Sequence, residues 1–415
     1  MTNAAQRIQR TYLTLTLLST LAASFIWGIN TLFLLDAGLT NTQAFAANAF
    51  YTAGQVIFEV PTGVVADMWG RRTSYLLGTA TLFSSTLLYL FMWQIEGPFW
   101  GWALSSVLIG LGFTFFSGAV EAWLVDALDA SGYEGRLEPV FGKGQTTAGV
   151  AMLVGSTAGG VVAQLTNLGV PFVLRAAMLV LTFGVAWFLM RDIGFSPHRD
   201  VAATDEMKRL LRESIDAGWR NPPMRWIMLA SPFSMGVGVF AFYAMQPYLL
   251  ELYGDQEAFA VAGIAAAIVA GAQIVGGLLV TRISRLFARR TSALLAAVFA
   301  STGALVLIGF TSSFWIAIAL LVVWALTFSA SAPLRQAYVN GIVSSEQRAT
   351  VLSFDALIAS TGGVVAQPLL GRVADVWSFS ASYLVAGSIQ LLAAPFVILS
   401  RRQQAPADLP EAAAA

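Results

Sequence analysis

The sequence predicts an all-α protein that crosses a membrane many times, and three observations support this fold class. Of its 415 residues, 57% are hydrophobic and only 11% are charged, whereas soluble domains carry about 25% charged residues. Twelve stretches are apolar and long enough to cross a bilayer, which takes about 20 residues of helix. Motifs of the first half also recur in the second half. A soluble enzyme is disfavoured because its surface would need more charge.

The twelve expected spans divide into two sets of six. Those of the first half are roughly 11–35, 41–66, 73–93, 98–127, 138–165 and 170–190. Those of the second half are roughly 225–250, 257–281, 291–311, 314–341, 347–370 and 379–400. Lys and Arg gather in the segments that a cytoplasmic N-terminus would place inside, with Arg372 as the clear exception. Both termini are therefore expected on the cytoplasmic side of the plasma (inner) membrane.

Two polar segments complete the expected organisation. The break at 191–224 joins residues 1–190, expected to form one six-helix bundle, to residues 225–402, expected to form a second. Within this break, 204–215 is interpreted as a short amphipathic helix on the membrane surface, with a plain solvated linker as the alternative. The tail 403–415 is rich in Ala, Pro and Glu and is expected to be disordered. The start of the chain lacks a clear cleavage site, which favours a retained first span.

The composition argues against several classes of chemistry. The chain has no cysteine and a single histidine, His198, so thiolate or histidine metal clusters are excluded, and neither a metal nor a cofactor is expected. Its net charge of zero suggests no nucleic-acid partner. No phosphate-binding loop of the ATPase type is present, which argues against a pump and against enzymatic activity. The expected partners are the lipid bilayer, a small-molecule substrate and a coupling proton, with the chain acting as a monomer.

An internal repeat relates the two halves. Arg71–Ser74 follows the second span with the letters Arg-Arg-Thr-Ser, and Arg289–Ser292 repeats them after the eighth. Gly159–Gln164 in the fifth span reads Gly-Gly-Val-Val-Ala-Gln, as does Gly362–Gln367 in the eleventh. The matches keep their order at spacings near half the chain, which indicates duplication. Two like halves around a central cavity are a recurrent transporter design, and we expect two pseudo-symmetric six-helix bundles.

The loop between the second and third spans carries the most specific motif, Gly63-Val-Val-Ala-Asp67-Met-Trp-Gly70-Arg71-Arg72. Here Gly63 would permit close helix approach, and Gly70 an unusual backbone angle. The segment resembles the signature loop of the major facilitator superfamily, Gly-x-x-x-Asp-x-x-Gly-Arg-Arg/Lys, in sequence and in position. The resemblance covers about the whole chain and implies two bundles that rock about a midplane site.

In that family the aspartate of the loop meets the start of span eleven, and its first arginine meets an acid near the end of span four. The resemblance therefore implies a conformational latch made of Gly63, Asp67, Gly70, Arg71, Arg72 and Asp126. The alternative is a loop that only sets topology through its basic residues. The second-half copy of the motif, Gly277–Arg282, lacks the aspartate, and its latch is expected to be weaker.

Ionisable residues inside spans are costly, at roughly 2.5–3.5 kcal/mol each on insertion scales, and point to function. Glu121 and Arg335 occupy corresponding positions of the two halves and are predicted to face the cavity and to pair across it. The alternative is that each is paired within its own bundle. Asp355 near mid-depth and Glu121 are the candidates for proton binding. Asp355 would not serve if Lys143 or another cation neutralises it, or if it faces a polar bundle seam. Glu59 is the weaker candidate, since it lies one turn before the signature loop.

Aromatic and amide side chains in the cavity helices form the candidate substrate lining. An apolar pocket with a few hydrogen-bonding groups would suit a lipophilic or amphipathic solute. The alternative is that these aromatics face lipid or form interface belts. The candidate lining residues are Trp27, Asn30, Phe113, Phe116, Phe240, Tyr243 and Gln246.

Within the superfamily, the chain is similar to bacterial multidrug and drug:proton exporters, although their motifs are incomplete. Ser156 stands in span five where the antiporter motif has proline, and Ser106 stands in span four where these exporters usually have arginine. The favoured function is proton-coupled efflux of a lipophilic or amphipathic solute by alternating access. The first alternative is a symporter or facilitator for a polar or charged metabolite. The second is a membrane sensor or scaffold that transports nothing.

Overall fold

The computed structural model describes residues 3–116, 118–195, 218–343 and 348–409, which are helical for most of their length and contain no strand. The described residues fall into two compact units. Unit 1 draws on Met1–Leu39, Phe50–Ala203 and Glu257–Ala267, and unit 2 on Thr40–Ala49, Thr204–Gln256 and Ile268–Ala415. Each unit thus includes a short segment from the other half of the sequence. The expected amphipathic helix at 204–215 lies outside the described residues, as does His198.

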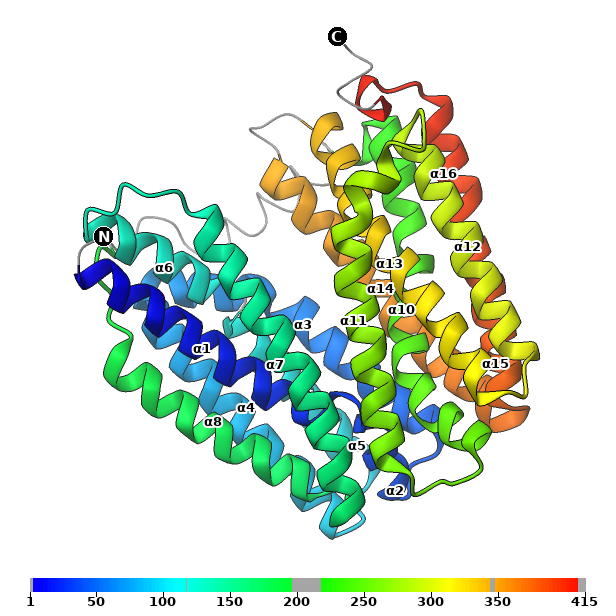
Figure 1. Cartoon of the computed structure of the whole chain (residues 1–415), viewed down its shortest axis with the longest axis horizontal. Helices are drawn as coiled ribbons and strands as arrows, with labels where there is room; N and C mark the ends of the chain where they lie inside the picture. The colour runs from blue at the N-terminus through cyan, green and yellow to red at the C-terminus, as the bar shows by residue number, and fades with distance from the viewer. Residues whose placement is uncertain (1–2, 117, 196–217, 344–347, 410–415) are drawn as a thin grey trace. The chain divides into compact units, whose positions relative to one another are not determined.

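Unit 1 contains the helices of the first half (Figure 1). In this unit α1 packs mainly against α7 and α8, and α4 packs mainly against α5 and α8. The helices are α1 (Asn3–Trp27), α2 (Asn30–Asp36), α3 (Asn41–Trp69, from Phe50 onward), α4 (Arg71–Gln94), α5 (Phe99–Phe116), α6 (Ala119–Ala130), α7 (Glu138–Leu165) and α8 (Val170–Leu189).

Unit 2 repeats this arrangement with the helices of the second half. Here α10 packs against α14 and α16, and α12 packs against α13 and α15. The helices are α10 (Pro222–Tyr253), α11 (Phe259–Ser284, from Ile268 onward), α12 (Arg290–Phe310), α13 (Phe314–Ile342), α14 (Arg348–Val376), α15 (Phe379–Leu391), α16 (Ala393–Arg402) and the short 3-10 helix η1 (Pro406–Asp408). Corresponding helices thus make corresponding contacts, as a duplication requires.

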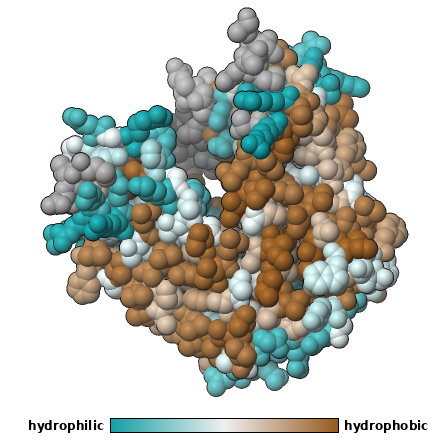
Figure 2. Space-filling view, in the orientation of Figure 1, coloured by the Kyte–Doolittle hydropathy of each residue, from teal (hydrophilic) through white to brown (hydrophobic). Residues whose placement is uncertain are grey.

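The outer faces of the helices are apolar, as expected for a chain in lipid. Large side chains such as Phe91, Trp100, Phe188, Leu278 and Trp315 are more than half exposed. Figure 2 shows hydrophobic residues over the helix sides and hydrophilic residues gathered toward helix ends. Because exposed apolar surface of this extent is unfavourable in water, the chain is a multi-pass membrane protein.

The number of spans agrees closely with the sequence prediction. Ten helical segments of the described chain are long and apolar enough to cross a membrane, and α1 with α2, bent by 47°, makes an eleventh. The remaining long helix is α3, which has 29 residues and contains Glu59 and Asp67.

Two spans of unit 1 are broken near predicted site residues. The first breaks at Gly28 and Ile29, between Trp27 and Asn30. In the fourth, α6 begins at Ala119 after Gly118, whose φ of 69° is not helical. Broken helices in transporters often border binding sites because their ends expose polar backbone groups.

The repeated Gly-Gly motif marks a close helix approach in each unit. A Cβ built on Gly159 of α7 would overlap the carbonyl oxygen of Phe25 in α1. A Cβ built on Gly362 of α14 would likewise overlap the carbonyl oxygen of Pro232 in α10. Small residues let backbones approach in this way within membranes. The first glycine of the repeated motif makes this contact in both halves.

Candidate functional site

The loop between α3 and α4 carries the first group of predicted residues, and the structure brings their charges together. The Arg71 guanidinium lies 2.6 Å from the Asp67 carboxylate and 4.0 Å from that of Asp126 on α6. Gly70 joins the two helices with a φ of 99°, a conformation that favours glycine. No described atom lies within 4 Å of a Cβ built on Gly63. The close helix approach expected at Gly63 and the latch role of the cluster stay predictions.

Asp192, which the sequence analysis did not single out, holds the start of α4. It follows α8, and its carboxylate accepts the backbone N–H of Arg72 at 2.9 Å. The Arg72 guanidinium donates to the carbonyl oxygen of Trp187 at 2.8 Å and lies 4.9 Å from the centre of that ring. Burial raises the pKa of Asp192, although the hydrogen bond and charge of Arg72 act in the opposite direction. The end of α8 is thus tied to the start of α4.

Asp408 makes the corresponding contact in unit 2. Its side chain is 2% exposed. One carboxylate oxygen accepts the backbone N–H of Thr291 at 2.8 Å, and the other accepts the Thr291 hydroxyl at 2.9 Å. The Arg290 guanidinium donates to the carbonyl oxygen of Ala407 at 2.7 Å, and Arg289 lies 3.9 Å from Asp408. The start of α12 is therefore capped by the segment after α16.

The contact of Asp408 with α12 corrects the prediction of a disordered tail and adds a contact to the predicted duplication. The tail from Gln403 was expected to be disordered, and for residues 403–409 that prediction is wrong. The partners of Asp408 lie 117 residues away in the sequence, so the composition of the tail gives no sign of them. Asp192 and Asp408 each follow the last helix of their unit and cap the helix that begins with Arg-Arg-Thr-Ser. The duplication thus includes a contact between segments that share no visible motif.

Removing either cap is expected to lower stability modestly. Replacement of Asp192 or Asp408 by alanine should cost about 1 kcal/mol, because a first-turn amide of α4 or α12 loses its side-chain acceptor. The measurement is thermal unfolding of the purified protein, with Asp129→Ala on the exposed end of α6 as the control. Unfolding temperatures equal to that of the control would contradict the capping role.

The protonation of Asp192 adds a second expectation. Because burial raises its pKa in the folded protein above the ordinary 3.8, folding favours the neutral acid. The stability linked to this group is complete below pH 3.8 and is lost as the pH rises through the raised pKa. At neutral pH, Asp192→Asn should therefore be at least as stable as the wild type, since asparagine is neutral and still accepts a hydrogen bond. A loss as large as that of Asp192→Ala would contradict this reasoning.

In unit 2 the structure joins two predicted residues for which the sequence suggested other partners. Arg335 of α13 and Asp355 of α14 form a bidentate ion pair, with both N–O distances at 2.5 Å. The same guanidinium donates to the hydroxyl of Ser231 on α10. The cation beside Asp355 is thus Arg335 rather than Lys143. Within unit 2 the carboxylate on Arg335 is that of Asp355, which is the alternative of pairing within its own bundle. Pairing with Glu121 across the cavity stays a prediction.

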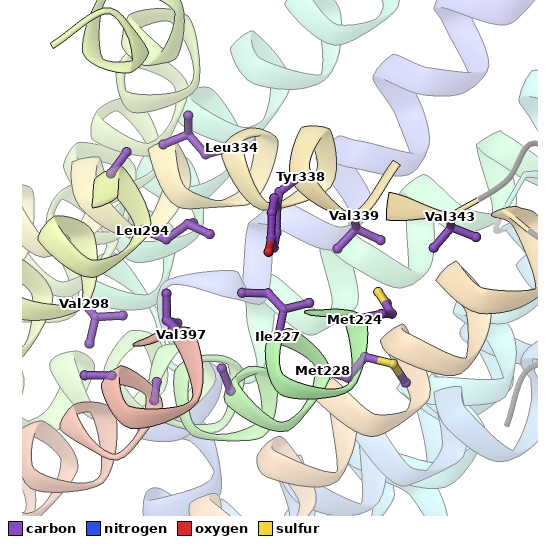
Figure 3. Close-up of a cluster of buried hydrophobic side chains, with 14 of the residues drawn as sticks. Met224, Ile227, Met228, Leu294, Val298, Leu334, Tyr338, Val339, Val343 and Val397 are labelled. Carbon is purple, nitrogen blue, oxygen red and sulfur yellow. The ribbon is translucent and has the colours of Figure 1, made fainter. Parts of the chain in front are cut away.

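A pocket inside unit 2 borders this ion pair. Its volume is about 180 Å³, and α10, α12, α13, α14, α15 and α16 all contribute to its wall. Among the described residues, Arg335 is the one charged residue of the lining. Apolar side chains make up much of the remainder, and Figure 3 shows four of them, Ile227, Leu294, Val298 and Val397, in the buried cluster that continues toward Tyr338. The pocket is an apolar space with one cation at its wall.

Hydroxyl and amide groups complete the lining. Gln390 of α15 donates to the hydroxyl of Ser234 on α10 at 3.3 Å. Ser301 of α12 is 3% exposed, and its hydroxyl has no hydrogen-bond partner in the structure. A buried hydroxyl without a partner costs about 1–3 kcal/mol, and the hydroxyl oxygen of Ser301 is itself enclosed by the surrounding residues. Sequence analysis missed all three, because isolated Ser and Gln residues in a span form no motif.

The other predicted ionisable residues lie apart from this pocket. Glu121 lies in the first turn of α6, after the break at Gly118, and its side chain is exposed. Lys143 of α7 and Glu59 of α3 are also exposed. None of the three lines the pocket of unit 2, and their coupling roles stay predictions.

The predicted lining residues are mostly packed against other aromatic rings. Phe240 is fully buried, with its ring 4.9 Å from that of Phe45. Phe116 stacks on Tyr75 at 4.5 Å. These distances describe well-packed interiors of the units. Phe240, Tyr243 and Gln246 do not line the pocket of unit 2, and a substrate-lining role for the set, which includes Trp27, Asn30 and Phe113, stays a prediction.

Comparison with protein families and sequences gives two findings. A family model described as the Major Facilitator Superfamily matches residues 12–300 and 256–414. An uncharacterised MFS-type transporter of Methanocaldococcus jannaschii is 20% identical over 242 residues, which are 58% of this chain and 60% of that protein. The similarity thus spans less than two thirds of the relative's length.

Solved structures share the fold at low identity. The nucleoside transporter NupG covers 95% of this chain with 99% of its own length, at 11% identity and a TM-score of 0.79. A bacterial homologue of the human lysosomal transporter Spinster, in an inward-facing and occupied conformation, covers 99% with 100% of its length, at 16% identity and a TM-score of 0.75. A POT family transporter in complex with 5-aminolevulinic acid covers 95% with 96% of its length, at 10% identity and a TM-score of 0.71. At these identities the likeness shows the fold alone.

Proposed function

The chain belongs to the major facilitator superfamily of transporters, and from this premise we propose that it moves a small amphipathic solute with a proton bound at the Arg335–Asp355 pair. Transport would proceed by alternating access in a plasma membrane with both termini cytoplasmic. The chain would act as a monomer and would need no cofactor.

One observation carries this proposal: a bidentate ion pair that borders an apolar pocket. Asp355 is buried, with 6% of its side chain exposed, and its carboxylate depends on Arg335 for neutralisation. A buried carboxylate that loses its counter-ion is strongly destabilised in the ionised form and takes up a proton instead. Any event in the pocket that draws Arg335 away therefore favours protonation of Asp355. Solute and proton binding are coupled by this geometry.

Two directions of coupling follow from the proposal. Efflux by proton antiport is the direction favoured by the similarity to drug:proton exporters, and it requires that solute and proton compete. Symport of a charged metabolite is the second candidate, and one observation favours it. Arg335 is the charged residue that lines the pocket, so a negatively charged group of the solute has a partner there.

The test is proton movement in proteoliposomes that enclose a pH-sensitive dye. Octanesulfonate and octyltrimethylammonium serve as solutes, because both keep their charge over the working range of pH. We expect one of them to cause protein-dependent proton flux, and Asp355→Asn to abolish that flux because asparagine cannot carry the proton.

Glu138→Gln is the matched control, since Glu138 is 69% exposed in a surface ion pair with Arg136. It should retain wild-type flux. Full solute-driven proton flux in Asp355→Asn would show that the proton is carried elsewhere, with Glu121 as the next candidate. Solute flux without any proton movement would instead identify a facilitator.

A further inference from the structure

We propose that the pocket of unit 2 selects an amphipathic organic anion, whose negative group replaces Asp355 as the partner of Arg335 while Asp355 takes up a proton. This inference rests on the proposed function and adds the charge of the solute and the sign of its coupling to the proton.

The positions of Arg335 and Asp355 relative to the pocket indicate the sign of the charge that the solute carries. Arg335 lines the pocket and has 27% of its side chain exposed, whereas Asp355 has 6% exposed and does not line it. A solute thus meets the guanidinium first, and the carboxylate lies behind it. A cation would be repelled by Arg335, whereas an anion gains a planar donor that binds oxyanions through two nitrogens at once. The geometry favours an anion.

The rest of the lining indicates an apolar body. Leu294, Val298 and Val397 form a wall beside Arg335, and Phe328 of α13 adds an aromatic surface. The volume of about 180 Å³ is below the roughly 300–1,000 Å³ of drug-sized ligand sites. The pocket therefore suits a small amphipath rather than a large drug.

The pocket differs from a simple packing defect. Voids left by imperfect packing are apolar and stay empty, whereas this one receives hydroxyl or amide groups from α10, α12, α13 and α15. Ser301 is buried with its hydroxyl unpartnered.

The coupling follows from the groups around Asp355. Within the described chain, the charged side chain recorded against it is Arg335 of α13, while Ser231 of α10 binds the same guanidinium. Tyr338, one turn further along α13, bonds Ser400 of α16 instead. Two ionised acids cannot share one guanidinium cheaply in an apolar site. When an anion binds, one proton from solution therefore binds the Asp355 carboxylate, and the net charge of the pocket is unchanged.

By thermodynamic reciprocity, the proton must then strengthen anion binding as much as the anion strengthens proton binding. Proton and anion are bound in the same state rather than exchanged. This linkage supports symport of the anion over its antiport.

The experiment measures binding to the full-length protein in lipid nanodiscs by calorimetry, with three solutes of equal chain length. They are octanesulfonate, octyltrimethylammonium and octanol. We expect octanesulfonate to bind at least about tenfold more tightly than the cation, because charge-assisted hydrogen bonds to arginine are among the strong ones. Its affinity should rise between about pH 8 and about pH 6, a range in which the sulfonate stays ionised, so the rise would report uptake of a proton by the protein.

Two variants test whether Arg335 and Asp355 are responsible for the preference for octanesulfonate. The double variant Arg335→Gln with Asp355→Asn removes both charges together and should lose the preference for octanesulfonate, while octanol binding stays within about twofold. Arg136→Gln, at a guanidinium that is 81% exposed, should behave as the wild type. If the double variant does not fold, the comparison of the three solutes with the wild type still decides.

Equal or tighter binding of the cation would overturn the inference, as would octanesulfonate binding that is unchanged in the folded double variant or that does not strengthen at lower pH. These failures are distinct from failure of the proposed function. If octyltrimethylammonium drives proton flux that Asp355→Asn abolishes, the coupling pair stands and the anion assignment falls. If Asp355→Asn keeps its flux, the coupling pair falls whichever solute binds.

Discussion

Replacement of Arg335 by glutamine alone is expected to lower the free energy of unfolding by about 3 kcal/mol. Removing one partner of a buried ion pair leaves the other charge without compensation, which typically costs about 3–5 kcal/mol. The lower end applies here because 27% of the Arg335 side chain is exposed. Reversible unfolding of the purified protein at neutral pH, followed by tryptophan fluorescence, is the measurement.

The double variant Arg335→Gln with Asp355→Asn tests the cause of this loss. With both charges removed, a neutral pair remains, and most of the stability should return, because such replacements of buried ion pairs are often near neutral. Lowering the pH should also stabilise Arg335→Gln relative to the wild type, because the orphaned carboxylate can then be protonated. A single variant as stable as the wild type at neutral pH would show that Asp355 has another partner.

Alanine at Gly159 or Gly362 is expected to destabilise the unit that contains it by about 1–3 kcal/mol, the usual cost of overpacking. The upper end is expected, because the added methyl group would meet the backbone carbonyl of Phe25 or Pro232 rather than a flexible side chain. Only a shift of α7 against α1, or of α14 against α10, could make room. Thermal unfolding and the yield of folded protein after detergent extraction would measure the effect.

Two glycines in the same units provide matched controls. Gly184 of α8 and Gly303 of α12 lie within helices, and no described atom lies within 4 Å of a Cβ built on either. Alanine at these positions should leave stability unchanged or raise it by up to about 1 kcal/mol, because alanine favours the helix over glycine. If all four variants behaved alike, close backbone approach at Gly159 and Gly362 would not be what stabilises the units.

The predictions from sequence agree best with the structure for features that depend on composition, on a repeated motif or on residues close together in the chain. A bilayer requires long apolar helices, so composition and span length predicted the all-α membrane fold without any knowledge of packing. The recurrence of Gly-Gly-Val-Val-Ala-Gln predicted a duplication, and the structure adds that its first glycine makes the same helix contact in both units. The signature loop placed Asp67 and Arg71 together because only a tight turn at Gly70 separates the end of α3 from the start of α4.

The predictions were weakest for contacts between distant segments. Arg335 and Asp355 were both selected as costly charges, yet their pairing was not predicted, because rotation about each helix axis decides which neighbours meet. Asp192 and Asp408 were not selected, since an acid in a polar segment is ordinary until a helix start is brought against it. Ser301 gave no signal at all, because an unpartnered hydroxyl is a property of its surroundings.

The amino-acid sequence by itself therefore determined that this protein lies in a lipid bilayer and that its fold is all-α. It also determined the internal duplication and the superfamily. Each of these depends on composition or on residues close together along the chain. The tertiary structure decided which charges are paired, which acids cap α4 and α12, and which charge faces the pocket. Those outcomes depend on how helices far apart in the sequence are rotated and how closely they approach. A small change in rotation or in distance would bring a different side chain into contact.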